Sequence, residues 1–315
     1  MSLFRLGVGL FAISVLCAPL AIALATLSGI GHRWTDILVQ FSAPALVATV
    51  LVSILLAVSG WRWQALFGAG VCSLLLVAVW PQWSPPRAAP QPGAAVIRLY
   101  SANLWVGNED VEAISRSIDR ADADIVVLIE LGDTPAARLD EILKAYPHRI
   151  TSVRVRRPNG ATRSLIASRY PLQGLWSLPE GTHMIGAVID TPVGPVNVIG
   201  AHLTRPWPFQ YQWGQIIQAQ KLAEYRHRLT GPVIVAGDFN SVSSGRIGRL
   251  VRSEADLVPA GGWPGTWPSA LPPMFGITID QVWRSRDLTF VSRRLAAPTG
   301  SDHRAVVTEF TLAAR

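Results

Sequence analysis

Polar side chains recur at the ends of apolar segments in the C-terminal two thirds of this 315-residue chain. They follow or precede short runs such as "DIVVLI", "VNVIGA" and "VIVAG", which have the composition of buried strands. The eight residues are Asn103, Glu130, His202, Asp238, Asn240, Asp280, Asp302 and His303, of which Asp280 interrupts the run "GITIDQVW" in its middle. A buried carboxylate is costly unless it is paired, hydrogen-bonded or bound to a metal. We therefore expect these side chains to converge on one cleft.

The chemistry available to this set is that of carboxylates, amides and imidazoles without thiols. Hard oxygen ligands suit Mg²⁺ or Mn²⁺, and Ca²⁺ less well, whereas zinc sites usually include sulfur or several imidazoles. Hydrolysis of a phosphoester by a divalent cation and a His–Asp pair uses these parts together. Taken alone, the adjacent Asp302 and His303 would more often form a solvated turn. The chain has no Walker loop, dinucleotide fingerprint or G-x-S-x-G elbow.

The elements that must position these residues lie between 96 and 315. "DIVVLIE", "VNVIGAHL" and "GPVIVAGDFNS" have strand composition, and "YQWGQIIQAQKLAEYRHRL" is typical of a long helix. A strand–helix–strand order is followed by strands in pairs. This order predicts a layered α/β sandwich and disfavours a strictly alternating parallel fold.

The first 80 residues have a different composition, with Asp36 as the single acidic residue. Apolar runs at about 6–27, 37–59 and 64–80 predict three transmembrane helices. The alternative for the first run is a cleaved signal peptide. A Pro-rich linker, 81–95, is expected to hold the globular domain away from the bilayer.

Membrane orientation follows from the distribution of arginines. Arg5 and Arg62 favour a cytoplasmic N-terminus, and three spans then place the globular domain outside the cytoplasm. Both cysteines, Cys17 and Cys72, lie in the apolar runs, so the globular domain is free of thiols. We therefore predict an integral protein of the plasma or inner membrane with an extracytoplasmic or periplasmic domain.

Residues 96–315 resemble the endonuclease/exonuclease/phosphatase superfamily, which includes pancreatic-type deoxyribonucleases, AP endonucleases, inositol polyphosphate 5-phosphatases and neutral sphingomyelinases. Six motifs carry the resemblance, in the order of that family: "SANLW", "DIVVLIE", "GAHL", "GDFNS", "ITIDQVW" and "GSDHRAV". The resemblance implies a four-layer α/β sandwich of two packed mixed sheets flanked by helices. It also implies Mg²⁺-dependent hydrolysis of a phosphodiester or phosphomonoester.

The resemblance implies a role for each of the eight residues. Glu130 would ligate the cation, with Asn103 and Asp302 beside it. Asp238 and Asn240 would orient the attacking water and the phosphate. His303, held by Asp280, would act as general base or phosphate ligand, and His202 would donate to a nonbridging phosphate oxygen. The base role is left open between His303 and Asp238.

Two departures from the family bear on the substrate. Ile129 stands where many members have Gln before the metal-binding Glu, which weakens a repair-nuclease interpretation. Arg157 and Arg163 lie between the Glu130 and His202 motifs and are candidates for phosphate contact.

The substrate itself stays open. Residues from Val96 onward contain 24 basic and 20 acidic side chains, so a polyanion is permitted but not required. A nucleic acid, a phospholipid or a small phosphodiester are all candidate partners, beside the lipid bilayer, and no obligate protein partner is expected. The alternative is a catalytically silent membrane scaffold, whereas a transporter is disfavoured because no span has a charge at its middle.

Overall fold

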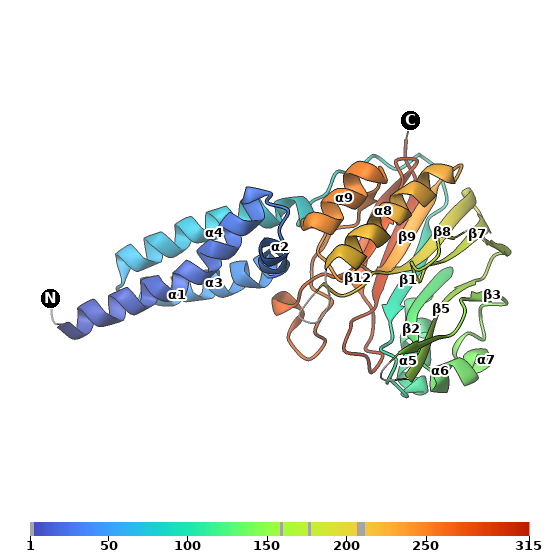
Figure 1. Ribbon diagram of the computed structural model, residues 1–315, viewed down its shortest axis with the longest axis horizontal. Coiled ribbons are helices and arrows are strands. Elements are labelled where there is room, and N and C mark those ends of the chain that lie inside the picture. The colour runs from blue at the N-terminus through green and yellow to red at the C-terminus, as the bar shows by residue number, and fades with distance from the viewer. Residues whose placement is uncertain (1–2, 158–159, 176–177, 207–211, 315) are drawn as a thin grey trace.

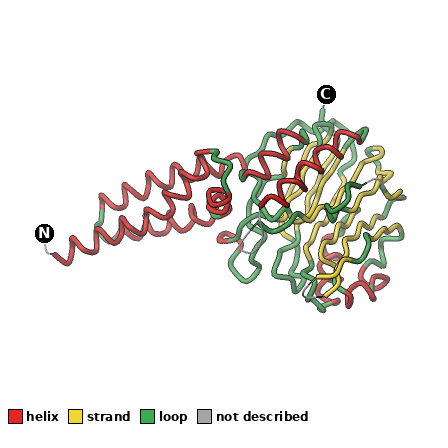
Figure 2. Tube along the Cα trace, viewed as in Figure 1, coloured by secondary structure: helices red, strands yellow, loops and turns green. Residues whose placement is uncertain are grey.

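The computed structural model describes residues 3–157, 160–175, 178–206 and 212–314. A bundle of helices projects from one side of a globular β-sandwich (Figure 1). The helices belong to the N-terminal part of the chain, and nearly all the strands lie in the sandwich (Figure 2).

The N-terminal bundle consists of α1 (Leu3–Ser28), α2 (Arg33–Gln40), α3 (Ser42–Val58) and α4 (Arg62–Trp83). Within the described residues, α1 and α4 are each long and apolar enough to cross a membrane. Helices α2 and α3 are bent by 55° at Phe41 and make a third span only if the bent pair is one span. The structure thus has two or three candidate spans. The predicted span at 37–59 is interrupted because α2 turns its polar side chains toward the sandwich.

The Pro-rich segment 81–95 differs from the expected spacer. Helix α4 continues through Pro81 to Trp83, and the rest of the segment lies along the sandwich. Its backbone exchanges hydrogen bonds with the C-terminal strand, from Gln91 N to Leu312 O at 2.9 Å and from Ala314 N to Ala89 O at 2.8 Å. These bonds hold the segment after α4 against the sandwich.

Two mixed sheets form the sandwich. The first has the order β12-β13-β1-β2-β5-β3, with β4 beside β5, and the second has the order β10-β11-β9-β8-β7-β6. The first sheet contains β1 (Ile97–Asn103), β2 (Ile125–Leu131), β3 (His148–Thr151), β4 (Val155–Arg157), β5 (Gly160–Ser168), β12 (Leu288–Leu295) and β13 (Val306–Leu312). The second contains β6 (Leu172–Gly174), β7 (Ile185–Thr191), β8 (Gly194–His202), β9 (Val233–Asp238), β10 (Val258–Pro259) and β11 (Asp280–Arg284).

Helices cover the outer face of each sheet. The described helices of the sandwich are α5 (Val111–Ala121), α6 (Asp133–Ala137), α7 (Leu139–Ile142), α8 (Gln212–Arg228), α9 (Arg246–Glu254) and the short 3-10 helix η1 (Pro273–Phe275). Val127 and Val198 belong to the apolar core between the sheets. Ile114 of α5 packs on the outer face of the first sheet, and Leu222 of α8 packs on that of the second. This is the four-layer arrangement of two mixed sheets flanked by helices that the motifs predict.

Candidate active site

The polar residues gather at one end of the sandwich because the strands that carry them run in parallel pairs. Strand β1 is parallel to β2, with Asn103 opposite Ile129, so Asn103 lies beside Glu130. Strand β8 is parallel to β9, with His202 opposite Asp238. Parallel strands end at the same edge of a sheet, and the two sheets therefore present these four side chains at one mouth.

A glycine makes the close approach of β8 and β9 possible. Gly237 has a φ of 143°, and a Cβ at this position would lie 2.0 Å from the carbonyl oxygen of Ala201. No other residue type fits this contact. The glycine of the "GDFN" motif thus fixes where Asp238 leaves the strand.

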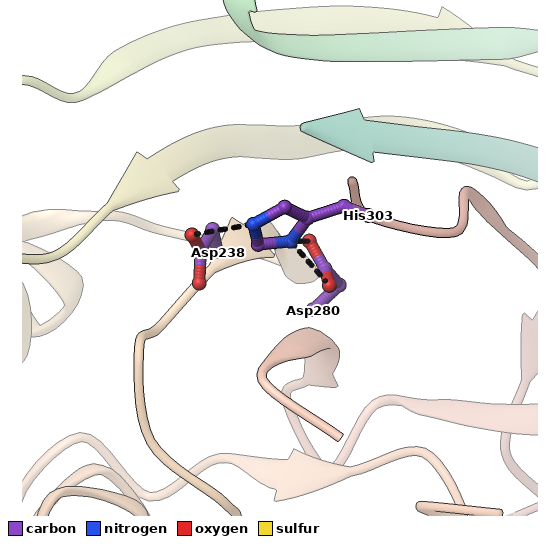
Figure 3. Close-up of side chains that lie close together, drawn as sticks. All are labelled: Asp238, Asp280 and His303. Atoms are coloured by element: carbon purple, nitrogen blue, oxygen red, sulfur yellow. Dashed lines mark hydrogen bonds and ion pairs between the residues drawn. The ribbon is translucent and has the colours of Figure 1, made fainter. Parts of the chain in front are cut away.

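His303 is held between two buried carboxylates (Figure 3). Its Nδ1 lies 3.1 and 2.9 Å from the two carboxylate oxygens of Asp280, and its Nε2 lies 4.0 Å from Asp238 Oδ2. The backbone N–H of His303 donates to Ser301 Oγ at 3.1 Å. Burial alone would lower the pKa of His303, but the charges of Asp280 and Asp238 outweigh it and raise the pKa to about 10. The imidazole is therefore protonated at neutral pH.

Asp238 is a buried carboxylate surrounded by hydrogen-bond donors. Its Oδ2 accepts from Asn103 Nδ2 at 3.1 Å and from Asn240 Nδ2 at 3.2 Å, and its Oδ1 accepts from Asn240 N at 2.8 Å. Burial raises the pKa of Asp238 to about 7, although the nearby His303 opposes the shift. A carboxylate with a pKa near neutrality can exchange a proton during turnover.

Glu130 and His202 form the opposite wall of the mouth. His202 Nε2 lies 3.2 Å from Glu130 Oε1 and 3.9 Å from Asp238 Oδ2. Glu130 has a positive φ of 54°, which is unusual for a residue with a side chain. It also follows a break in the β2–β5 register. This irregularity turns its half-buried carboxylate toward the mouth.

The donor set fits a hard divalent cation. Asp238, Asp280 and His303 are three ionisable groups whose ligand atoms lie within 4.8 Å of one another. Asp280 is engaged by His303, so we interpret these two as a pair, and Glu130 with Asn103 beside it remains the predicted cation site. Carboxylate and amide oxygens are the ligands that Mg²⁺ prefers. A cation here would offset the cost of burying Asp238.

An open pocket of about 390 Å³ begins at Glu130 and His202 and extends toward β5. Arg163 lines it, and its guanidinium pairs with Asp133 at 2.9 Å while its buried Nε has no hydrogen-bond partner. An anion in the pocket would provide that partner. The side chain of Arg157 lies outside the described part of the structure.

His183 also lines this pocket and was not among the candidate site residues. Two other histidines have structural contacts. His32 accepts from Trp34 N at the start of α2, and His227 Nε2 lies 2.6 Å from the carbonyl oxygen of Glu254.

Asp302 is turned away from the other candidate ligands. Its exposed carboxylate accepts a hydrogen bond from Trp267 Nε1 at 3.2 Å. Trp267 belongs to the Gly- and Pro-rich segment 261–273. The cation role predicted for Asp302 therefore stays a prediction. Most of the aromatic stretch 205–213 lies outside the described residues.

Two residues of α2 contact the loop that follows Asp238, residues 239–246, which we call the catalytic loop. Neither residue was among the candidates. Gln40 Oε1 accepts from Val242 N at 2.8 Å, and the Asp36 carboxylate accepts from Arg246 N at 2.7 Å. Asp36 and Gln40 are four residues apart and so share one helix face. The sequence feature that could have identified them is a pair of polar residues, four positions apart, at the start of an apolar run.

A family model described as the Endonuclease/Exonuclease/phosphatase family matches residues 100–303. The chain belongs to this family, whose members hydrolyse phosphoester bonds with the help of divalent metals. The fold, the motif order and the gathered side chains agree with that assignment.

Solved structures of this family share the fold at low sequence identity. An endonuclease/exonuclease/phosphatase from Beutenbergia cavernae is 20% identical, with a TM-score of 0.54 over 69% of this chain and 72% of that one. A Staphylococcus aureus beta toxin variant with bound magnesium ions is 14% identical, with a TM-score of 0.54 over 68% and 99%. The human Nocturnin catalytic domain with bound sulfate is 17% identical, with a TM-score of 0.52 over 71% and 97%. A search of curated proteins found no match.

Proposed function

We propose that this protein is a membrane-anchored, Mg²⁺- or Mn²⁺-dependent phosphoesterase whose active site is the mouth formed by β1, β2, β8, β9 and β11. The observation that carries the proposal is the placement of His303 between Asp280 and Asp238. A scaffold that had lost catalysis would have no need for two buried carboxylates around one imidazole, since each costs folding stability.

The pKa values favour a division of roles that the sequence left open. Asp238, with a pKa of about 7, is the group able to accept the proton of an attacking water. His303, with a pKa of about 10, carries a proton on Nε2 and can donate to a phosphate oxygen. Asp280 fixes the orientation of the ring through Nδ1. His202 lies on the far side and is a second donor for developing negative charge.

The cation would be held by Glu130, with Asn103 nearby. It would supply positive charge against the phosphate oxygens. Asn240 orients Asp238, because its side-chain amide donates both to Asp238 and to the carbonyl oxygen of Leu203 at 2.9 Å. Arg163 is the proposed contact for the substrate phosphate in the adjoining pocket.

The anchor and the location are also part of the proposal. Helices α1 and α4, and α2 with α3 as one broken span, would embed the chain in the plasma or inner membrane with the sandwich outside the cytoplasm. The α2 contacts with the catalytic loop would keep the mouth close to the membrane surface. A phosphodiester of a lipid or a nucleic acid could reach it there.

The test uses the full chain purified in detergent, with bis-p-nitrophenyl phosphate and Mg²⁺ or Mn²⁺. We expect turnover that Asp280→Asn and, at limiting Mg²⁺, Glu130→Gln strongly reduce, while the exposed Glu224→Gln on α8 retains it. Equal rates in all four proteins would support the silent scaffold instead. The same preparation against DNA, RNA and phospholipid vesicles identifies the substrate class.

A further inference from the structure

Two hollows adjoin each other where the helical bundle meets the sandwich. The first is an apolar groove of about 700 Å³ between α3 and α4. The second is a smaller pocket of about 200 Å³ on the sandwich. Trp83 and Trp263 line both, with their ring centroids 4.8 Å apart. The two hollows are therefore parts of one continuous surface, apolar at one end and basic at the other.

The groove has the dimensions of one half of a bilayer. It follows α4 from Cys72 to Trp83, which is about 16 Å at the rise of an α-helix. The hydrocarbon core of a membrane is about 30 Å thick, so this length corresponds to one leaflet. The groove ends at a pair of tryptophans, the residue type that favours the membrane interface.

The smaller pocket is lined by two arginines and by no acidic residue. Arg87 is exposed and has no hydrogen-bond or ion-pair partner among the described residues. Arg293 donates from Nη1 to the carbonyl oxygen of Pro264 at 3.1 Å, while its buried Nη2 has no partner. Burial lowers the pKa of Arg293 to about 10, although the charge of Asp280 opposes the shift, and an anion in the pocket would oppose it further.

The boundary between the two hollows carries another unused donor. Trp83 Nε1 is buried and has no hydrogen-bond partner in the described part of the chain. A buried donor without an acceptor costs about 1–3 kcal/mol. An ester or phosphate oxygen at the level of Trp83 would accept this hydrogen bond.

We propose that an anionic phospholipid binds at this junction, with one acyl chain in the groove between α3 and α4 and its phosphate between Arg87 and Arg293. The proposal rests on the membrane anchoring in the proposed function, but not on the phosphoesterase chemistry. The lipid would act as a structural ligand that fixes the sandwich on the bundle. This site lies apart from the pocket at Glu130 and His202, with which it shares no lining residue.

Charge and shape together select the occupant. A free phosphate would satisfy the arginines and leave the groove open, whereas a zwitterionic lipid would fill the groove and bring a positive group to the arginines. An anionic lipid from the adjoining leaflet satisfies both, because arginine and phosphate form strong charge-assisted hydrogen bonds.

The test is native mass spectrometry of the full-length protein after incubation with equimolar phosphatidylglycerol and phosphatidylcholine. We expect the wild type to retain phosphatidylglycerol by about tenfold over phosphatidylcholine, and Arg87→Ala and Trp83→Phe to lose that preference. Arg294→Ala is the matched control. It removes a neighbouring exposed arginine whose side chain points to the other face of β12, and we expect it to behave as the wild type.

A second arm separates a lipid from a free anion. Ser73→Phe narrows the groove from α4, and Ser14→Phe on α1 is its control outside the groove. We expect only Ser73→Phe to lower lipid retention, and soluble glycerol phosphate to compete poorly. Equal retention of the two lipids by the wild type, or full competition by glycerol phosphate, would overturn the proposal. Hydrolysis of bis-p-nitrophenyl phosphate is measured separately, so failure of lipid binding and failure of the proposed activity are distinguishable.

Discussion

The side-chain oxygen of Gln40 accepts a hydrogen bond from the backbone N–H of Val242 at 2.8 Å. Gln40 ends α2, and Val242 lies four residues after Asp238. A second bond joins Gln40 Nε2 to Ser241 Oγ at 3.3 Å, and Val39 packs against Val242 and Ile279. The N-terminal bundle therefore contacts the two segments that carry Asp238 and Asp280.

This contact predicts that Gln40→Ala slows catalysis without removing a catalytic group. The variant leaves the buried Val242 N–H without an acceptor, at a cost of about 1–3 kcal/mol. The loop carrying Asp238 would shift, and small misplacements of catalytic groups are costly. We expect kcat to fall by about tenfold or more with little change in KM, measured on bis-p-nitrophenyl phosphate in detergent.

Two variants control for general destabilisation by Gln40→Ala. Gln64→Ala removes a glutamine of α4 that takes no part in this contact, and its rate should equal that of the wild type. Gln40→Glu keeps an acceptor for Val242 and should recover part of the rate. The positioning role is wrong if Gln40→Ala and Gln64→Ala have the same kcat.

Asp280→Asn tests the His–Asp pair directly. An amide of nearly the same size preserves packing but no longer attracts the proton of His303 Nδ1, so the ring loses its orientation and its raised pKa. We expect kcat to decrease by about 10²- to 10⁴-fold. Asp190→Asn, which replaces an exposed carboxylate on β7 with an amide, serves as the matched control. A variant Asp280→Asn that retained half of the wild-type rate would argue against the pair.

Metal removal tests the role assigned to Glu130. We expect treatment with a chelator to abolish hydrolysis and Mg²⁺ or Mn²⁺ to restore it. Glu130→Gln should require a higher Mg²⁺ concentration for half-maximal rate, because it loses one charged ligand. Titration of the metal in wild type, Glu130→Gln and Glu224→Gln measures this shift. Hydrolysis that survives exhaustive chelation would contradict a metal-dependent mechanism.

The stability of the metal-free protein should decrease as the pH rises. The pKa of His303 is raised from 6.5 to about 10 in the folded state, so its stabilising contribution is complete below pH 6.5 and is lost as the pH rises through about 10. The raised pKa of Asp238 acts in the same direction, and its stabilising contribution is lost as the pH rises through about 7.

Thermal unfolding of the chelated full-length protein at pH 6, 8 and 10 measures this dependence. We expect the midpoint to fall across the series in the wild type and to fall less in Asp280→Asn, which lacks the interaction that raises the pKa of His303. A wild-type midpoint that rose between pH 6 and pH 10 would contradict the assignment.

Much of the gathering of polar side chains at the candidate site could be predicted from the sequence, because these residues lie at strand ends. Asn103, Glu130, His202 and Asp238 each follow an apolar run. A strand that ends in a polar residue delivers that residue to the sheet edge whatever the partner strand is. The order of apolar runs predicted a layered α/β sandwich, and the two packed sheets with outer helices were implied by the resemblance of the motifs to the family.

The pairing of particular side chains was decided only by the tertiary structure. Asp302 is adjacent to His303, yet its carboxylate accepts a hydrogen bond from Trp267 Nε1, whereas His303 pairs with Asp280, because the chain bends at 301–303. The contact between Gln40 and Val242 joins residues 202 positions apart. Composition groups α2 with the apolar helices. Only the packing of α2 against the sandwich brings its polar face into hydrogen-bonding contact with the catalytic loop.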